Sequence, residues 1–184
     1  MRRLSVFNFM TLNGFFKGPG EDISWNKHGA EEASFSAEGL QTGNVLLFGR
    51  TTYHLMESFW QTPAAFEMFP VVAEGMNKAE KIVFSSSLEK VEWNNTRLIK
   101  DNIVEEVKKI KKTPGKDLTL LGSGNILTQF AEHGLIDEYQ IMIYPVAIGE
   151  GTPMFKGIGS ALTLQLVATR TFKSGSVLLT YHPK

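Results

Sequence analysis

The chain has 184 residues, and 42% of them are hydrophobic, so it can bury the core of one domain but is short for two. Its 19 basic and 19 acidic residues cancel, so no overall field draws the protein to nucleic acid or to an anionic membrane. We therefore expect one domain over residues 1–184 that binds small molecules or copies of itself, with no nucleic-acid or membrane partner.

Residues that bind metals or form disulfides are scarce. The chain contains no cysteine, which excludes disulfides, thiolate nucleophiles and cysteine-ligated metals. Its four histidines form neither an HxxxH nor an HxH pair: His28, His54, His133 and His182. We therefore expect no metal site.

The N-terminal segment is predicted to be a strand rather than a targeting signal. Asn8 interrupts the apolar run from Leu4 to Met10, and no small-residue cleavage site follows it. No apolar run approaches the length of about 20 residues that crosses a bilayer. We therefore expect a cytoplasmic location.

The first half of the chain shows short strands and a helix. Leu4–Met10 is rich in β-forming residues on both faces, and Asn13-Gly14 is a turn signal. Further strands are predicted at Val45–Phe48, Lys81–Phe84 and Arg97–Ile99, with a helix at Thr51–Ser58.

The next segments alternate helix and strand. Apolar residues from Ile103 to Ile110 lie at the spacing of one helix face, and Asn102 with Glu105 has the pattern of a capping box. The predicted elements that follow are a helix end at Pro114-Gly115, a strand at Leu118–Leu121, and a helix at Asn125–His133 that ends at Gly134.

The last third of the chain is predicted to form strands only. Tyr139–Val146 is a long strand, and Leu162–Phe172 pairs with Ser176–Tyr181 through a short turn. Strands that alternate with helices imply parallel pairing, and the hairpin adds antiparallel strands. The fold class is therefore α/β: a mixed, mostly parallel sheet with helices on both faces and a C-terminal antiparallel hairpin.

Ligands of such sheets bind beyond the carboxyl ends of the strands, and three strand exits carry residues suited to phosphates. The exits are Gly49-Arg50-Thr51-Thr52, Ser85-Ser86-Ser87 and Gly122-Ser123-Gly124-Asn125. They offer flexible glycines, a guanidinium and several hydroxyls at helix or turn starts. Taken together, they indicate a nucleotide-binding edge.

Each exit also has an ordinary structural explanation. Thr51 can cap a helix while Arg50 is solvated, and serines after strands are common turn residues. The third exit resembles the start of a GxGxxG fingerprint, but Leu127 replaces the last glycine. Taken one at a time, the exits leave both interpretations open.

In this order and spacing, the segments resemble the dihydrofolate reductase superfamily, most closely the reductase (C-terminal) domain of the bifunctional riboflavin-biosynthesis deaminase-reductase. The resemblance spans nearly the whole chain. It rests on Phe9–Gly14, Trp25, Leu47–Tyr53, Ile82–Ser86, Leu121–Gly124, Ile136–Tyr139 and Pro145–Phe155. It implies a dihydrofolate reductase-like fold.

The resemblance also implies NADPH as the cofactor. The implied cofactor-binding residues are Gly49, Arg50, Thr51 and Thr52 at the phosphates, Ser85 and Ser86 at the adenosine ribose phosphate, and Gly122, Ser123, Gly124 and Asn125 at the pyrophosphate. Arg50 is the clearest candidate for a preference of NADPH over NADH, and Lys90 is a weaker one.

On the substrate side, the resemblance makes Glu31, with Glu32 beside it, the candidate carboxylate for substrate binding or proton relay. Asn13 is a further candidate catalytic position, where riboflavin reductases usually carry an aspartate, and an amide cannot serve as an acid. Trp25 and Phe16 are candidates to stack on a flat heterocycle. The structural alternatives are solvated glutamates on a helix face and aromatic residues packed in the core.

The predicted function is an NADPH-dependent reductase that resembles 5-amino-6-(5-phosphoribosylamino)uracil reductase and acts on a small heterocyclic or carbonyl substrate by hydride transfer. The alternatives are a true dihydrofolate reductase and a non-catalytic NADP-binding module. The zinc-binding cysteines of a deaminase domain are absent. The resemblance implies a homodimer, with Ile141–Val146 as a candidate interface.

Overall fold

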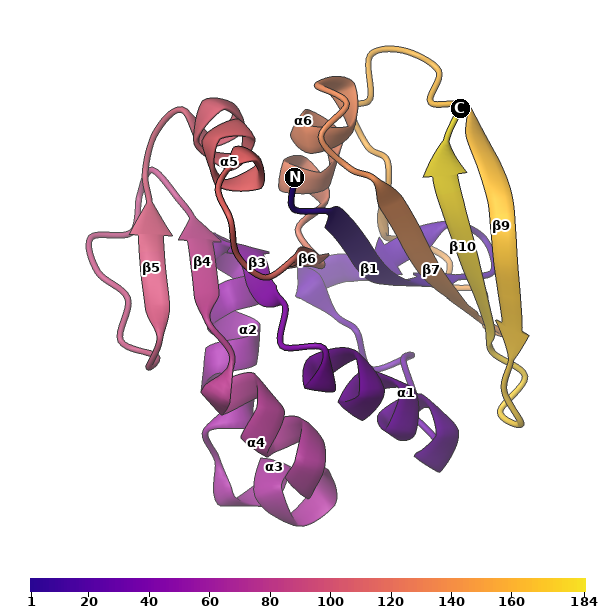
Figure 1. Ribbon diagram of the computed structural model, residues 1–184. Helices are drawn as coiled ribbons and strands as arrows, with labels where there is room; N and C mark the ends of the chain where they lie inside the picture. Colours follow the sequence, from indigo (N-terminus) through magenta and orange to yellow (C-terminus); the bar gives the residue numbers. More distant parts are fainter.

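The computed structural model describes residues 1–184 and is built around one eight-stranded sheet. The strand order is β5-β4-β3-β6-β1-β7-β10-β9 (Figure 1). Every pairing from β5 to β7 is parallel, whereas β10 pairs antiparallel with β7 and with β9. The predicted mixed, mostly parallel sheet with a C-terminal antiparallel hairpin is confirmed.

All the predicted strands are present, and their ends differ from the predicted ones by no more than two residues. The main sheet contains β1 (Leu4–Thr11), β3 (Val45–Gly49), β4 (Lys81–Phe84), β5 (Thr96–Ile99), β6 (Leu118–Leu121), β7 (Glu138–Tyr144), β9 (Leu164–Thr171) and β10 (Val177–Pro183). A second, two-stranded sheet pairs β2 (Phe15–Lys17) with β8 (Thr152–Pro153).

Helices cover both faces of the sheet (Figure 1). One face carries α1 (Ala30–Gln41), α2 (Arg50–Trp60), α3 (Pro63–Met68) and α4 (Pro70–Lys78), and the other carries α5 (Ile103–Lys112) and α6 (Gly124–Glu132). The inner strands β3 and β4 are buried along their whole length because apolar helices pack on each side. None of the helices combines the length and apolarity needed to cross a lipid bilayer.

The end of α6 follows the sequence prediction. Gly134 has a φ of 60°, in the left-handed region that favours glycine. Its amide donates to the carbonyl of Ala131, and the Leu135 amide donates to the carbonyl of Phe130. These two bonds satisfy the last free carbonyls of the helix and set the direction of the chain into β7.

The predicted capping box at the start of α5 is wrong. Asn102 precedes the helix with a left-handed φ of 51°, and its side chain binds no helix amide. A capping residue needs an extended backbone for its side chain to reach the amides of the first turn. In the left-handed conformation, the Asn102 side chain cannot reach them. Glu105 instead lies 2.7 Å from Lys108, one turn further along α5.

The sequence patterns did not mark α1, α3 or α4. The two short helices begin at Pro63 and Pro70, and proline suits a first helical turn because that turn needs no N–H donor. Thr62 caps α3 by accepting a hydrogen bond from the Ala65 amide at 3.2 Å. In α1, serines and a glycine interrupt the apolar residues, so no clear apolar stripe marks the helix.

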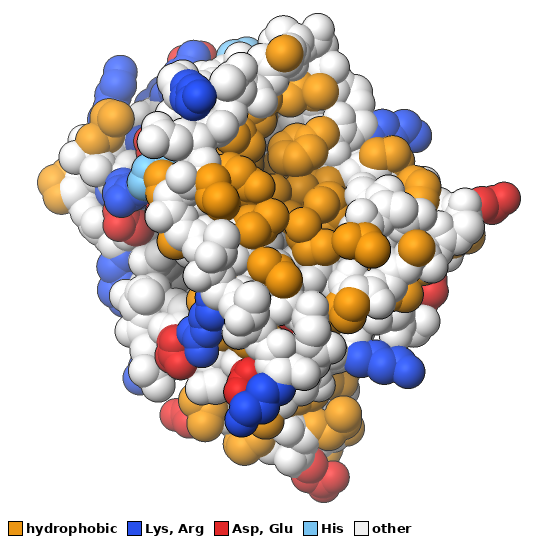
Figure 2. All heavy atoms as spheres, turned by 90° about the vertical axis from the view of Figure 1, so that its right-hand side faces the viewer, with side chains coloured by type: hydrophobic (Ala, Val, Ile, Leu, Met, Phe, Trp, Pro, Cys, Tyr) orange, Lys and Arg blue, Asp and Glu red, His pale blue; other side chains and the backbone are white.

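One side of the molecule presents an apolar surface, which we call the β9–β10 face. Both faces of the edge strand β9 are open, and Leu166 and Val167 are 49% and 46% exposed. Figure 2 shows hydrophobic side chains gathered in a hollow on this side, with charged side chains around the rim. Half-buried Ile143 and Leu179 lie on the neighbouring strands β7 and β10.

A buried lysine closes the C-terminal end of α4. Lys81, the first residue of β4, is 1% exposed, and its Nζ donates to the carbonyls of Met76 and Ala79 at 2.9 and 2.7 Å. The ammonium also lies 4.5 Å from the centre of the Trp93 ring. Burial lowers the pKa of Lys81 from 10.5 to about 8. The charged form is therefore disfavoured in the native state.

We predict that Lys81→Met removes a pH dependence of stability. Between pH 8 and 10.5, an unfolded chain binds a proton at Lys81 that the native protein lacks, so the free energy of unfolding rises with pH in this window. From pH 8 to 10.5, the free energy of unfolding of the wild type should rise by up to about 3 kcal/mol more than that of the variant.

Urea unfolding at several pH values measures this difference. The control is Lys78→Met, which removes an exposed lysine from the last turn of α4, close to Lys81 in sequence. A difference between wild type and Lys81→Met that stays constant from pH 8 to 10.5 would contradict the prediction.

Candidate functional site

The predicted exits meet at one edge of the sheet. Because β4, β3 and β6 are adjacent and parallel, their carboxyl ends at Phe84, Gly49 and Leu121 lie side by side. Two helices, α2 and α6, start directly beyond β3 and β6. The three exits that the sequence indicated therefore lie along one continuous edge of the sheet.

The hydroxyl of Ser123 joins the exits of β3 and β6. It accepts a hydrogen bond from the Gly49 amide at 2.6 Å and donates one to Thr52 Oγ1 at 3.0 Å. Gly122 and Ser123 both have left-handed φ values, 61° and 63°, which turn the chain sharply into α6. A Cβ on Gly122 would lie 2.9 Å from Thr52 Oγ1, so this position requires glycine.

The first turns of α2 and α6 offer free backbone donors. Neither Gly49 nor Ser123, the residues that precede these helices, provides a side-chain cap, and neither first turn carries an acidic residue. The first amides of a helix have no partner within the helix, and the helix dipole favours negative charge there. Two such helix starts at one edge of a sheet fit the phosphates of a dinucleotide.

Arg50 points to the exit of β4. Its Nη1 donates to Ser87 Oγ at 3.0 Å, which holds the guanidinium beside the turn after β4. Ser85 Oγ accepts a hydrogen bond from the Leu88 amide at 3.1 Å and so shapes that turn. Ser86 is exposed. The sequence singled out all three hydroxyls of this turn, and the one that contacts the arginine is Ser87.

The remaining cofactor candidates differ in their surroundings. Thr51 and Asn125 are exposed in the first turns of α2 and α6. Gly124 is covered by Phe16, since a Cβ there would lie 2.9 Å from Phe16 Cζ. Phe16, expected on the substrate side, thus packs over the start of α6.

Asn13 makes hydrogen bonds with both ends of its amide. Nδ2 donates to the Ile148 carbonyl at 2.8 Å, and Oδ1 accepts from Thr11 Oγ1 at 2.9 Å. The side chain thus joins the turn after β1 to the loop between β7 and β8. These contacts explain an amide at this position by its pairing with the backbone.

A cluster of aromatic rings lies near the ends of β1 and β7. Trp25 and Tyr144 meet edge to face, with ring centres 5.8 Å apart, and Phe9 meets Tyr144 at the same separation. The Tyr144 hydroxyl lies 3.2 Å from Nδ1 of His28. Trp25 Nε1 is buried without a hydrogen-bond partner. Sequence patterns missed His28 and Tyr144 because 116 residues separate them along the chain.

The two glutamates at the start of α1 bind the turn between β9 and β10. Glu31 accepts a hydrogen bond from the Lys173 amide at 2.8 Å and lies 3.3 Å from its Nζ. The hydrogen bond from the Lys173 amide is the main cause that lowers the pKa of Glu31. Glu32 is 1% exposed and accepts hydrogen bonds from Ser174 Oγ and, at 3.0 Å, from the Gly29 amide.

Burial raises the pKa of Glu32, but these hydrogen bonds outweigh it and leave the pKa below its usual value. Both carboxylates are therefore ionised at neutral pH and act as acceptors. The sequence singled out Glu31 as the candidate carboxylate, whereas the more buried of the two is Glu32.

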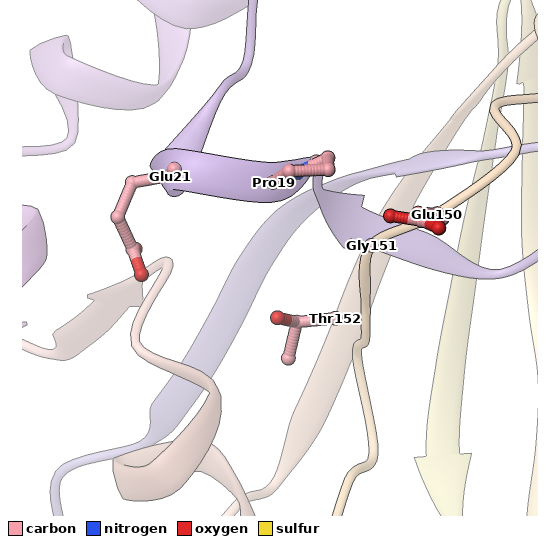
Figure 3. Close-up of a pocket in the computed structure, with 7 residues that line it drawn as sticks. Pro19, Glu21, Glu150, Gly151 and Thr152 are labelled. Atoms are coloured by element: carbon pink, nitrogen blue, oxygen red, sulfur yellow. The ribbon is translucent and has the colours of Figure 1, made fainter.

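A shallow, polar pocket of about 300 Å³ lies between two loops, with Gly18–Glu21 on one side and Glu150–Thr152 on the other. Figure 3 shows Glu21 and Glu150 at opposite sides of it. Glu21 pairs with Lys17 Nζ at 2.5 Å. Two carboxylates make the pocket a poor phosphate site. No group of three His, Asp or Glu side chains in the structure is close enough to hold a metal ion.

Comparisons with known proteins identify the family of the chain. The family model described as the RibD C-terminal domain matches residues 2–178. The chain is 33% identical to the Bacillus subtilis (strain 168) protein YyaP over 181 residues, 98% of this chain and 95% of YyaP.

Two solved structures are similar in fold. A putative riboflavin biosynthesis protein from Shewanella sp. PV-4 matches with a TM-score of 0.77 and 20% identity over 99% of both chains. Dihydrofolate reductase from Enterococcus faecalis, complexed with NADP(H), matches with a TM-score of 0.65 and 18% identity over 99% of this chain and 96% of that one. The fold is thus dihydrofolate reductase-like, and the chain belongs to the RibD C-terminal domain family.

Proposed function

We propose that this protein is an NADPH-dependent reductase that transfers a hydride to a small heterocyclic or carbonyl substrate. The observation that carries the proposal is the pair of uncapped helix starts, α2 and α6, joined through Ser123 and placed beside Arg50. The family and the NADP(H) complex of the similar dihydrofolate reductase support it.

NADPH would lie along the carboxyl edge of the sheet. Arg50, Thr51 and Thr52 would hold phosphate at the start of α2, and the Gly122–Asn125 turn would hold the pyrophosphate at the start of α6. Ser85, Ser86 and Ser87 would surround the ribose phosphate, within reach of the Arg50 guanidinium. When bound, the cofactor supplies the hydride, and these residues bind and orient it.

The substrate would lie against the aromatic cluster near the ends of β1 and β7. The half-buried rings of Trp25 and Phe9 would contact a flat heterocycle, and the buried ring of Tyr144 packs behind them. A turnover assay with NADPH over pyrimidine and pterin substrates separates the candidate functions. Reduction of dihydrofolate that methotrexate inhibits would favour a true dihydrofolate reductase, and NADPH binding without any turnover would favour a non-catalytic module.

The β9–β10 face provides a surface for a second copy of this chain. Its centre is apolar, with charged side chains around the rim (Figure 2), so two copies can meet there without burying unpaired charge. We therefore propose a homodimer whose interface includes β9 and β10. Ile143, within the segment that the sequence indicated, lies at its margin on β7.

For the cofactor, we predict that Arg50→Ala lowers the preference for NADPH over NADH by about tenfold to a hundredfold. A charge-assisted hydrogen bond to the 2′-phosphate is lost, and NADH never makes it. Titrations of both cofactors against wild type and variant measure the ratio. Lys90→Ala is the matched control, because it removes a nearby cation that pairs with Glu92. An unchanged ratio in Arg50→Ala would refute the assignment.

For the proton, we predict that Glu31→Gln keeps the hydride-transfer rate close to that of the wild type. The carboxylate is ionised by its contacts with Lys173, so it holds no proton to deliver. Single-turnover kinetics across pH measure the rate. A fall of about 10² to 10⁴-fold, the usual contribution of a general acid, would instead make Glu31 the proton source.

For the oligomer, we predict that Leu166→Asp converts a dimer into a monomer, because a charge would enter the apolar β9–β10 face. Analytical ultracentrifugation of both proteins gives the masses. The control is Leu55→Asp on α2, where Leu55 is 41% exposed and away from this face. A wild-type protein that sediments as a monomer would contradict the proposed interface.

A further inference from the structure

We propose that His28 donates a hydrogen bond from Nε2 to an acceptor atom of the heterocyclic substrate, and that Tyr144 positions His28 for this contact. The inference deepens the proposed function and rests on it, because it concerns the substrate side of the same edge. No sequence pattern singled out either residue. The assignment depends on their juxtaposition in the fold.

His28 is held from two strands. Its Nδ1 lies 3.2 Å from the hydroxyl of Tyr144, the last residue of β7. Its ring meets Phe9 of β1 edge to face, with centres 4.8 Å apart, and Tyr144 at 6.1 Å. No protein group bonds Nε2, and part of the residue is exposed. One ring nitrogen is therefore fixed and the other is available.

The Tyr144 hydroxyl determines where His28 carries its proton. A neutral imidazole has one N–H, and the nitrogen that accepts a hydrogen bond is the one without it. Desolvation of the ring edge against Phe9 and Tyr144 lowers the pKa of His28, and the Glu32 carboxylate of α1 opposes this only in part. Burial also raises the pKa of Tyr144, so its hydroxyl keeps the proton. Nδ1 is the one hydrogen-bond partner of the Tyr144 hydroxyl, so in the proposed arrangement the hydroxyl donates to Nδ1 and Nε2 carries the N–H.

Two further polar atoms near His28 have no partner. Trp25 Nε1 and Asn26 Oδ1 are buried and make no hydrogen bond. Buried polar atoms without partners are uncommon in native proteins, and a binding site is one explanation for them. Residues 25–28 therefore carry one unbonded donor on the exposed His28 side chain and, beneath it, one donor and one acceptor that are buried without partners. A planar ring with carbonyl oxygens and N–H groups along its edge complements that set.

The two carboxylates of α1 do not compete for this role. Glu31 is held by Lys173, and Glu32 by Ser174 and the Gly29 amide. Of His28, Glu31, Glu32 and Tyr144, only His28 is exposed, and its Nε2 has no hydrogen-bond partner in the protein.

The first test reads the tautomer of His28 in the free protein. In ¹⁵N-histidine NMR spectra, the wild type should show the proton on Nε2, and Tyr144→Phe should show a mixture of both tautomers. Tyr144→Phe keeps the aromatic ring and removes only the hydroxyl. A wild-type proton on Nδ1, or no change in the variant, would overturn the positioning role of Tyr144.

The second test uses uracil as a probe, since it carries two ring carbonyls and two N–H groups. Uracil should shift the His28 resonances of the wild type, and His28→Leu should weaken its binding about tenfold. His28→Gln, which keeps an N–H donor, should recover part of the loss. The matched control is His54→Leu, which removes an exposed histidine of α2 and should leave uracil binding unchanged.

NADPH titration of the same variants separates the two proposals. Failure of the wild type to bind NADPH would refute the proposed function. Unchanged uracil affinity in His28→Leu, or no effect of uracil on the wild-type His28 resonances, would overturn this inference while NADPH binding still stands.

Discussion

The hydrogen bond between the Gly49 amide and the Ser123 hydroxyl joins two chain segments that lie 74 residues apart. It sets the distance between the starts of α2 and α6, because each residue directly precedes its helix. The bond depends on the sheet order, which places β6 beside β3, and on Gly122, whose missing side chain leaves room for Thr52. The spacing of the proposed phosphate donors follows from these features.

The segment that carries the proposed substrate contacts is anchored by the C-terminal hairpin. The turn between β9 and β10 binds Glu31 through Lys173 and Glu32 through Ser174, so the start of α1 is tied to the C-terminal hairpin. His28 lies just before this helix and contacts β7, to which the hairpin is paired. The hairpin therefore supports the site without contributing a side chain to the proposed substrate contacts.

Sequence reasoning succeeded where the signal is local. The strand from Val45 is a continuous apolar run, the helix after Ser123 has apolar residues at helical spacing, and glycines bound both. The parallel pairing of the strands follows from their alternation with helices. Sequence reasoning failed where a site depends on contacts between residues far apart in the chain. The contact of His28 with Tyr144 depends on a neighbour 116 residues away.

The carboxylates of α1 show the same limit. Whether Glu31 or Glu32 is buried depends on how the helix is rotated against the hairpin. Serines and a glycine in α1 hide its apolar face, so the pattern of residues does not reveal that rotation.

The place of β1 in the sheet has a consequence for synthesis on the ribosome. Its neighbours are β6 and β7, so Val6 has no strand to pair with until Leu120 and Tyr139 have been made. Parallel pairing at such separation closes slowly, and an unpaired apolar strand is prone to aggregate in the meantime. During most of translation, β1 is therefore unpaired in the nascent chain. Chaperones that bind extended apolar segments could bind it during that time.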